Sequence, residues 1–223
     1  MTFEKTTSSM KNFIVGYGSL ISSESRKVTG LSSDALPVWI HKYERSWSAS
    51  FPEIKFCALA VKSDTHKKMN AVLFECPDLE SFDKREWGYT RTKLNPDLVE
   101  MYVAHSLKPE GHYWIYITNE ERCTPCSQEN LIWQSYVDVC LTGCLEYSEL
   151  FVADFIRHTT GWQNQFWAND RHSSEYLKAL KNFKPDKIDL ILKAYEIGPE
   201  NETSDNKELA AYVRSKLNGQ NNS

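Results

Sequence analysis

The strongest structural signal in the sequence is the stretch MKNFIVGYGSLIS, which spans residues 10–22. Its first half is an apolar run typical of a β-strand, and the segment GYGSL follows at residues 16–20. Glycine accepts backbone conformations with positive φ and lets another group approach the main chain closely. The stretch therefore predicts a strand that leads into a tight turn whose backbone amides stay accessible.

This turn differs from the known glycine-rich nucleotide and nucleophile motifs. A dinucleotide fingerprint requires a third glycine where this sequence has Ile21, and the Gly-Lys-Ser/Thr of a phosphate-binding loop is absent. A nucleophile elbow requires glycines two residues on either side of the serine, whereas Ser19 directly follows Gly18. We therefore expect the loop to bind through its backbone, although six histidines elsewhere leave a partner for Ser19 open.

The chain up to about residue 118 is predicted to be rich in β-strands. Such a series of short strands favours a mixed sheet that curls toward a small barrel. The expected fold class is α+β, with helices flanking the sheet. Further strands are expected at residues 38–50, 57–63, 69–76, 88–94, 98–106 and 112–118, with a polar turn at 64–68 and a short helix over 77–86.

The sequence becomes helical from residue 127 onward. The predicted organisation is a main domain at 12–156 and a C-terminal helical extension at 157–217 packed on it. Residues 1–11 and 218–223 are expected to be flexible. Helices are expected over 127–147, 148–159, 174–183 and 186–197, with an aromatic, polar loop at 161–173.

The composition limits the classes of partner. The chain has 223 residues and a formal net charge of −4, which argues against nucleic acid or an anionic membrane as the main partner. No apolar stretch approaches the roughly 20 residues of a membrane-spanning helix. The N-terminal residues lack the apolar segment of a secretory signal. We therefore expect a cytoplasmic enzyme or binding protein, either a monomer or a homodimer.

Six cysteines require a zinc site to be considered. Cys123 and Cys126 form a CxxC pair, and Cys140 and Cys144 follow at CxxxC spacing. Cys140, however, lies on an apolar stripe at helical spacing with Ile132, where a thiol usually acts as a small hydrophobic group. We therefore expect no metal, and disulfides are not expected in a cytoplasmic protein.

One carboxylate of the short helix is expected to point inward. Leu79, Phe82 and Glu86 are spaced at i, i+3 and i+7 and share one helix face. Because Leu79 and Phe82 are core anchors, Glu86 is directed inward or toward a cavity edge, where desolvation raises the pKa of its carboxyl. Such a group exchanges a proton near neutral pH, as general acid–base catalysis requires. From periodicity alone, a Glu86 that ends the helix in solvent is an equal alternative.

Two segments together resemble the gamma-glutamylcyclotransferase family. They are FIVGYGSLI at residues 13–21, with Tyr-Gly-Ser-Leu after the first strand, and FDKREWGYTR at residues 82–91, with the form D-x-x-E-x-G-Y-x-R. HYWIYIT at residues 112–118 resembles the family's tyrosine-bearing strand, and residues 127–147 resemble the helix that follows. The resemblance covers roughly residues 12–156.

The resemblance implies a small β-barrel with flanking helices, no metal and no cofactor. It also implies a small-molecule γ-glutamyl substrate, whose α-amine attacks its own γ-carbonyl to form 5-oxoproline and expel an amine, amino acid or peptide. Glu86 matches the family's acid–base residue. The residues implied to bind the substrate are Tyr17, Gly18, Ser19, Leu20, Tyr89, Arg91 and Tyr116.

The sequence leaves open the role of the C-terminal extension, the identity of the substrate and two alternative functions. The extension at 157–217, which compact members of the family lack, has no assigned role, and the γ-glutamyl substrate is not specified. A different γ-glutamyl or acyl-transfer enzyme on the same scaffold fits the same motifs. A non-catalytic γ-glutamyl-binding or regulatory module fits them too, because a fold does not guarantee a function.

Overall fold

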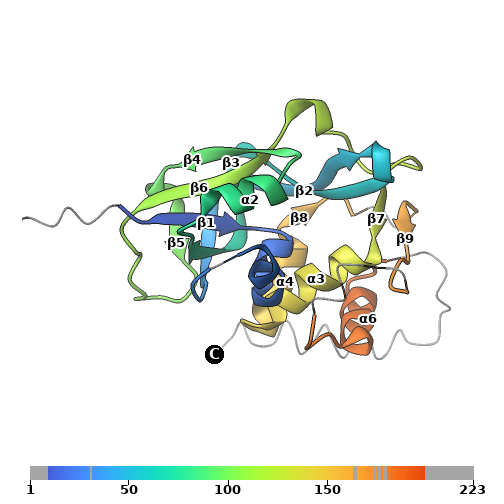
Figure 1. Cartoon of the computed structure of the whole chain (residues 1–223). Coiled ribbons are helices and arrows are strands. Elements are labelled where there is room, and N and C mark those ends of the chain that lie inside the picture. The colour runs from blue at the N-terminus through green and yellow to red at the C-terminus, as the bar shows by residue number, and fades with distance from the viewer. Residues whose placement is uncertain are drawn as a thin grey trace, which may run out of the picture.

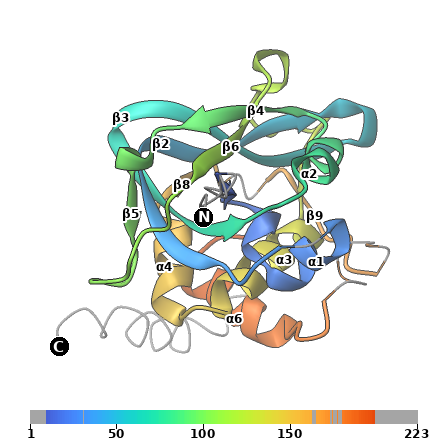
Figure 2. The ribbon, with the colours of Figure 1, turned by 60° about the vertical axis from the view of Figure 1, so that its left-hand side comes forward.

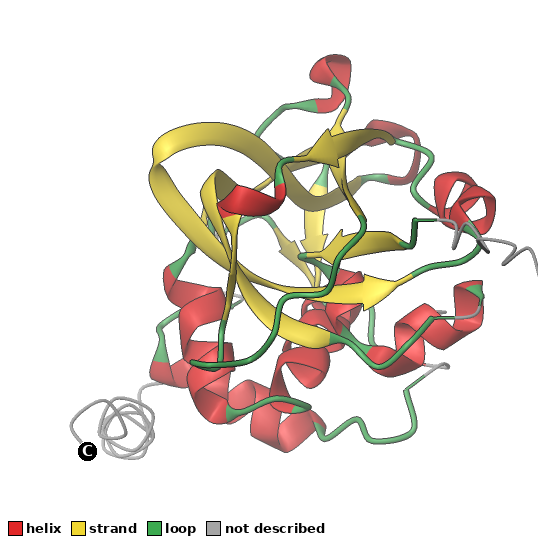
Figure 3. Cartoon of the chain, turned by 90° about the vertical axis from the view of Figure 1, so that its left-hand side faces the viewer, coloured by secondary structure: helices red, strands yellow, loops and turns green. Residues whose placement is uncertain are grey.

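The fold is α+β, with one mixed, curled β-sheet covered on one side by helices (Figures 1 and 3). This arrangement confirms the fold class predicted from the sequence. Of the segments expected to be flexible at 1–11 and 218–223, residues 1–9 and 218–223 lie outside the described residues, as does much of the helix expected at 174–183. The computed structural model describes residues 10–30, 32–162, 165–172, 174, 177 and 180–198.

The sheet is built around its two longest strands, β2 (Leu36–Phe51) and β3 (Phe56–Glu75). Its main order is β4-β6-β1-β3-β2-β5, in which β1 pairs antiparallel with β3 and parallel with β6. Figure 2 shows β2 and β3 bending together, so that the sheet curls into a half-barrel. The other strands are β1 (Asn12–Gly16), β4 (Tyr89–Leu94), β5 (Val99–Met101), β6 (His112–Thr118), β7 (Leu131–Trp133), β8 (Thr159–Thr160) and β9 (Trp167–Ala168).

Strand β3 corrects one expectation. The polar residues 64–68 do not separate two strands but belong to the single strand β3. Both halves of β3 pair antiparallel with β2. Before the polar residues Ser63 pairs with Tyr43, and after them Lys68 pairs with His41. The intervening residues of β3 form a large bulge that makes the pairing irregular without reversing the chain.

Most helices gather below the sheet and beside the loop that follows β1, whereas the helix at Leu79–Arg85 lies higher, next to β6 (Figure 1). Ile132, expected on a helical stripe, lies in β7, so α3 begins only at Gln134. None of the helices that the structure describes is long and apolar enough to cross a membrane. The described α-helices are α1 (Ser23–Thr29), α2 (Leu79–Arg85), α3 (Gln134–Leu145), α4 (Glu149–Arg157) and α6 (Pro185–Ala194).

A fully buried arginine, Arg45 of β2, joins the loop after β1 to the sheet and to α4. Its guanidinium donates to the Tyr17 carbonyl at 3.2 Å, to the Asn70 carbonyl at 2.7 Å and to the Phe155 carbonyl at 2.9 Å. Burial lowers the pKa of Arg45 to about 10, so the group stays charged at neutral pH. Arg45 therefore holds the backbone at Tyr17 in place from below.

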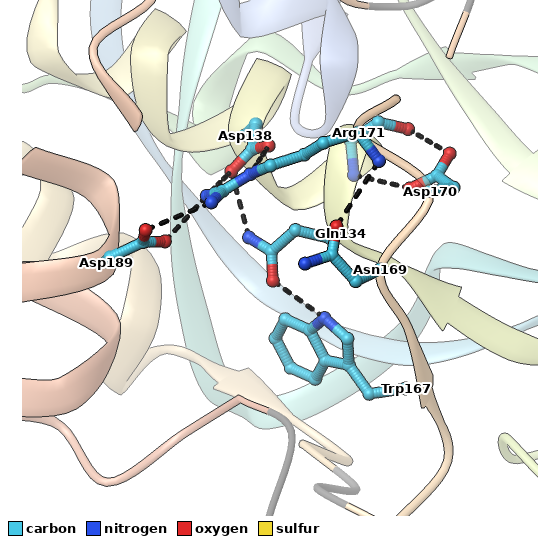
Figure 4. A network of polar contacts seen from close by, with 8 residues as sticks. Gln134, Asp138, Trp167, Asn169, Asp170, Arg171 and Asp189 are labelled. Atoms are coloured by element: carbon cyan, nitrogen blue, oxygen red, sulfur yellow. Dashed lines mark hydrogen bonds and ion pairs between the residues drawn. The ribbon is translucent and has the colours of Figure 1, made fainter. Parts of the chain in front are cut away.

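The described part of the C-terminal extension is attached by strands and by an ion-pair network that reaches one fully buried carboxylate, that of Asp138. β8 pairs with β2 and β9 pairs with β7. The extension, which was expected to be helical, therefore also contributes two short strands to the sheet. Arg171 lies between two carboxylates, 2.8 Å from Asp138 of α3 and 2.6 Å from Asp189 of α6 (Figure 4). Asp170 accepts a 2.9 Å hydrogen bond from the Ser135 N–H and so satisfies a backbone donor at the start of α3.

Candidate active site

The loop after β1 forms one wall of the candidate site. It continues from Gly16 into a short 3₁₀ turn, Ser19–Ile21, which is closed by a 2.9 Å hydrogen bond from the Ile21 N–H to the Gly18 carbonyl. Within the described part of the chain, the N–H groups of Ser19 and Leu20 have no hydrogen-bond partner. The structure thus contains the predicted tight turn, with two backbone donors that remain available.

The glycines of this loop serve close packing and not positive φ. Neither Gly16 nor Gly18 has a positive φ, so that part of the expectation is wrong. A Cβ atom added to Gly18 would lie 2.7 Å from the hydroxyl oxygen of Tyr136, and one added to Gly16 would lie 2.8 Å from the Cβ of Leu20. The group that approaches Gly18 closely is therefore a side chain of α3.

Glu86 forms the opposite wall. It ends α2, where its N–H donates to the Phe82 carbonyl at 2.9 Å, and Phe82 is fully buried. Only 17% of the Glu86 side chain is exposed, unlike the alternative in which this residue ends the helix in solvent. Burial raises the pKa of the Glu86 carboxyl above its usual value, and the Arg85 guanidinium at 3.1 Å offsets part of that rise.

Arg85 connects the two walls, and the sequence alone did not indicate this role. Its Nε pairs with Glu86, and its Nη2 donates to the Ser19 hydroxyl at 3.1 Å and to the Ser25 hydroxyl at 2.8 Å. Its Nη1 donates to the Ser25 carbonyl at 2.7 Å and to the Thr29 hydroxyl at 2.6 Å. These contacts use all five N–H groups of the guanidinium. Arg85 therefore orients Glu86 and Ser19 and has no donor left for a ligand.

A cavity of about 350 Å³ lies between these walls. Ser19, Arg85, Glu86, Tyr89 and Tyr136 line it, together with an apolar group of side chains. A small void of about 20 Å³ shares four of these residues and extends the space under the loop. Of the residues that the resemblance assigned to substrate or catalysis, the void is lined by Tyr17, Gly18, Ser19, Leu20, Glu86, Tyr89 and Tyr116.

The tyrosines expected at the site are held by the protein itself. The Tyr17 hydroxyl donates to the Tyr116 carbonyl at 2.7 Å, and the Tyr89 hydroxyl donates to the Leu59 carbonyl at 3.0 Å. The Tyr116 hydroxyl donates to Asp83 at 2.9 Å. Burial raises the pKa of Tyr17 and of Tyr116, so both hydroxyls stay protonated at neutral pH. These side chains therefore contribute rigid walls and not free acids or bases.

Arg91 lies apart from the cavity. Its guanidinium pairs with Asp83 at 2.9 Å and lies over the ring of Trp114, and it lines neither the cavity nor the adjoining void. Asp83 also accepts from Tyr116, so it joins α2 to β4 and β6. The carboxylate that Arg91 pairs with is thus a protein group, and a role of Arg91 in substrate binding stays a prediction.

The cysteines of the two short-spaced pairs do not converge. The Sγ of Cys126 lies 2.8 Å from the Sγ of Cys57, whereas Cys140 and Cys144 are buried in α3. Burial raises the pKa of both α3 thiols, as expected for small hydrophobic groups. Over the described residues, no cluster of three or more His, Cys, Asp or Glu side chains is placed to hold a metal ion.

The arrangement combines a proton carrier with hydrogen-bond donors across one cavity. A carboxyl of raised pKa can accept a proton and return it, and it is held by an arginine that does not itself face the ligand. The unpaired amides of Ser19 and Leu20 can bind a carboxylate or an oxygen that becomes negative during a reaction. These are the two groups that an intramolecular acyl transfer requires.

Comparisons with known proteins identify the fold. Among solved structures, a gamma-glutamyl cyclotransferase aligns at 12% identity with a TM-score of 0.49, over 92% of this chain and 99% of its own. YkqA from Bacillus subtilis aligns at 16% identity with a TM-score of 0.51, over 66% of this chain and 54% of its own. A glutathione-specific gamma-glutamyl cyclotransferase from yeast aligns at 12% identity with a TM-score of 0.40, over 66% of this chain and 87% of its own.

No protein-family model matches the chain, and no curated protein matches it in sequence. At 16% identity, the similarity to YkqA shows a shared fold alone. That similarity agrees with the curled mixed-sheet α+β fold described above.

Proposed function

We propose that this protein is a gamma-glutamylcyclotransferase-type enzyme that converts a γ-glutamyl compound to 5-oxoproline and releases the amine. One observation carries the proposal: the buried carboxyl of Glu86, whose pKa is raised, lines the same small void as Ser19 and Leu20, whose amides have no partner among the described residues. The motifs around both elements resemble the same enzyme family. The substrate is accordingly a small molecule.

Glu86 acts as the proton carrier in this reaction. Its carboxylate takes a proton from the α-ammonium of the substrate, and the freed nitrogen attacks the γ-carbonyl carbon. A new C–N bond closes the five-membered ring, and the bond from that carbon to the leaving nitrogen breaks. Glu86 returns this proton to the leaving nitrogen, and the ring nitrogen then gives its second proton to the carboxylate, which passes it to the released amine. No water is consumed, and the products are 5-oxoproline and the amine as its ammonium ion.

The loop after β1 holds the glutamyl end of the substrate. The amides of Ser19 and Leu20 donate to its α-carboxylate or to the oxygen that becomes negative as the ring closes. Because ring closure is intramolecular, a site that folds the substrate into attack geometry removes much of the barrier. The Ser19 hydroxyl accepts from Arg85 and serves to position the loop and not to attack.

The proposal is tested by measuring 5-oxoproline release from a panel of γ-glutamyl compounds. The panel contains glutathione, γ-glutamyl-alanine, γ-glutamyl-lysine and an amide without a second carboxylate, γ-glutamyl-phenethylamide, and mass spectrometry quantifies 5-oxoproline and the released amine. We expect equimolar release of both products from at least one compound. If every compound is returned intact while the protein remains folded, the proposed function is wrong, and a binding module on this scaffold becomes the better account.

A further inference from the structure

The cavity has two chemically different ends. Ser19, Ser25, Thr29, Arg85 and Glu86 form a polar end beside the loop after β1. The other end is apolar and aromatic, and most of its residues come from the end of β2, the turn that follows it and the start of β3. Its lining residues are Val28, Phe51, Ile54, Phe56, Ala58 and Trp87.

Aromatic rings surround the apolar end closely. The ring centroid of Phe51 lies 5.1 Å from that of Trp87 and 5.9 Å from that of Phe56. Phe56 in turn lies 5.2 Å from Tyr136, which reaches the polar end. Such rings favour another ring at stacked or edge-to-face distance, which adds to the gain from burying apolar surface.

The mouth of this end is open to solvent although it is apolar. Trp87 is 54% exposed, Ile54 is 48% exposed and Val28 is 73% exposed. Large apolar side chains that gather in the open at the edge of a cavity are typical of a ligand-binding surface. The described chain thus leaves uncovered an apolar surface that continues directly from Glu86.

The apolar end offers no free positive charge. Of the described residues that line the cavity, Arg85 is the only cation, and all of its donors are used by the protein. Arg122 does not line the cavity; it pairs with Glu53 at 2.8 Å, and its guanidinium lies 4.8 Å from the ring centroids of Phe51 and Trp87. A leaving group with a carboxylate would therefore lose water there without gaining an ion pair.

We propose that the amine expelled from the γ-glutamyl group is aromatic and carries no carboxylate of its own. This inference rests on the proposed function, because it assigns the polar end to the glutamyl group and the apolar end to the leaving group. The aromatic ring of the leaving amine lies against Phe51, Phe56 and Trp87, which places the bond to be broken beside Glu86. The covalent step is the ring closure described above.

Three synthetic conjugates separate the effect of an aromatic ring in the leaving amine from the effect of a carboxylate. They are γ-glutamyl-phenethylamide, γ-glutamyl-ethylamide, which lacks the phenyl ring, and γ-glutamyl-phenylalanine, which adds a carboxylate. Burying a phenyl ring in an apolar site predicts a kcat/KM for the phenethylamide about 10-fold or more above that for the ethylamide. The phenylalanine conjugate is expected to react more slowly than the phenethylamide.

A matched pair of variants assigns the preference to this cavity. Ile54→Ala is expected to lower the phenethylamide-to-ethylamide ratio of kcat/KM by about 3-fold or more, because it removes apolar contact area at the mouth. Leu107→Ala removes an equally large side chain that is 91% exposed and does not line the cavity, and it should leave the ratio unchanged. A ratio near one in the wild type, or faster release from the phenylalanine conjugate, overturns the inference.

Calorimetric binding of the same three conjugates separates this inference from the proposed function. If none of them releases 5-oxoproline, the proposed function fails. Tighter binding of the phenethylamide than of the ethylamide would still support an apolar ligand site, whereas equal binding would overturn that as well. Release of 5-oxoproline without any preference for the ring would leave the enzyme activity standing and contradict the aromatic leaving group.

Discussion

The burial of Glu86 lowers folding stability when its carboxyl is ionised, but it also raises the pKa of that carboxyl, which acid–base catalysis can use. Burial raises the pKa of its carboxyl, so the folded chain binds the proton more tightly than the unfolded chain. The ionised side chain therefore lowers stability above the folded-state pKa, and this cost disappears below the unfolded-state pKa, where the group is protonated in both states. A carboxylate kept at such a cost is typical of a functional site.

The pH dependence of stability follows from this sign. Glu86→Gln removes the ionised form, so the variant should unfold at a higher urea concentration than wild type at pH 7.5, and the difference should shrink as the pH falls toward 4. Urea unfolding followed by tryptophan fluorescence at the two pH values measures it. A variant that is less stable than wild type at pH 7.5 would contradict the raised pKa.

The pH dependence of activity tests the raised pKa of Glu86, and a substitution of Arg85 tests how that neighbour affects it. The acid limb of kcat/KM should have its midpoint above the usual glutamate pKa, since the proposed reaction begins with the ionised carboxylate. Arg85→Gln removes the cation that lowers the pKa of Glu86, so it should move this midpoint to higher pH. Lys84→Gln, at an exposed position of the same helix, serves as the control and should leave the midpoint in place.

The inward direction of Glu86 was one of two equal alternatives from the sequence periodicity, whereas the role of Arg85 was not indicated at all. Leu79, Phe82 and Glu86 share a helix face, and this periodicity is visible along the chain. Arg85, by contrast, is defined by its donors to Ser19 and to helix α1, about sixty residues earlier in the chain. Such contacts depend on the packing of elements and leave no local pattern.

At the scale of elements, helix α3 packs directly against the loop after β1. A Cβ on Gly143 would lie 2.4 Å from the Ser22 backbone nitrogen, and one on Gly18 would lie 2.7 Å from the Tyr136 hydroxyl oxygen. The two glycines thus let the backbone of the loop and the helix approach each other. This approach places Tyr136 on the cavity wall together with Ser19.

This contact predicts a specific rescue. Gly18→Ala should destabilise the protein by about 1–3 kcal/mol, because the added methyl group overlaps the Tyr136 hydroxyl. The double variant Gly18→Ala with Tyr136→Phe should recover part of this loss, since the remaining neighbours lie at 3.6 Å or more. A double-mutant cycle from urea unfolding measures the coupling. Additive losses would show that the hydroxyl is not what excludes a side chain at position 18.

The elements themselves were predictable to different degrees. β1 and α2 follow from a strand pattern and from a helix start that Asp78 caps by accepting from the Ser81 N–H at 3.2 Å. The continuity of β3 did not follow, because residues 64–68 read as a turn and only the pairing with β2 shows that the chain runs on. Strand pairing between distant segments is a tertiary property that local sequence does not carry.

At the scale of the whole molecule, the described C-terminal extension is locked to α3 by the network around Arg171 (Figure 4). The Asp138 side chain is fully buried, and burial raises the pKa of its carboxyl although Arg171 and Gln134 both donate to it. Trp167 also donates to Gln134, at 2.9 Å. Since α3 carries Tyr136 to the cavity, this network supports the site from the far side of the helix.

Removing the Arg171 guanidinium should therefore lower the stability of the protein. Arg171→Met leaves the Asp138 carboxylate buried without its charge partner, and the expected loss of stability is about 3–5 kcal/mol. The loss should be smaller at pH 4, where protonation relieves the buried charge. Lys187→Met breaks the exposed pair with Glu149 that also joins the extension to the main body, and it should cost only about 0–1 kcal/mol. Equal losses of stability for the two variants in urea unfolding would contradict a larger contribution from the Arg171–Asp138 ion pair.

The measurement that tests the central claim most directly is the rate of 5-oxoproline release by wild type, Glu86→Gln and Glu80→Gln with the best γ-glutamyl substrate. Glu80 belongs to the same helix but is 79% exposed and pairs with Lys84, so its variant controls for the loss of a carboxylate from α2. We predict a loss of about 100-fold or more for Glu86→Gln, with wild-type rates for Glu80→Gln. Full turnover by a folded Glu86→Gln protein would contradict the role of Glu86 as the proton carrier.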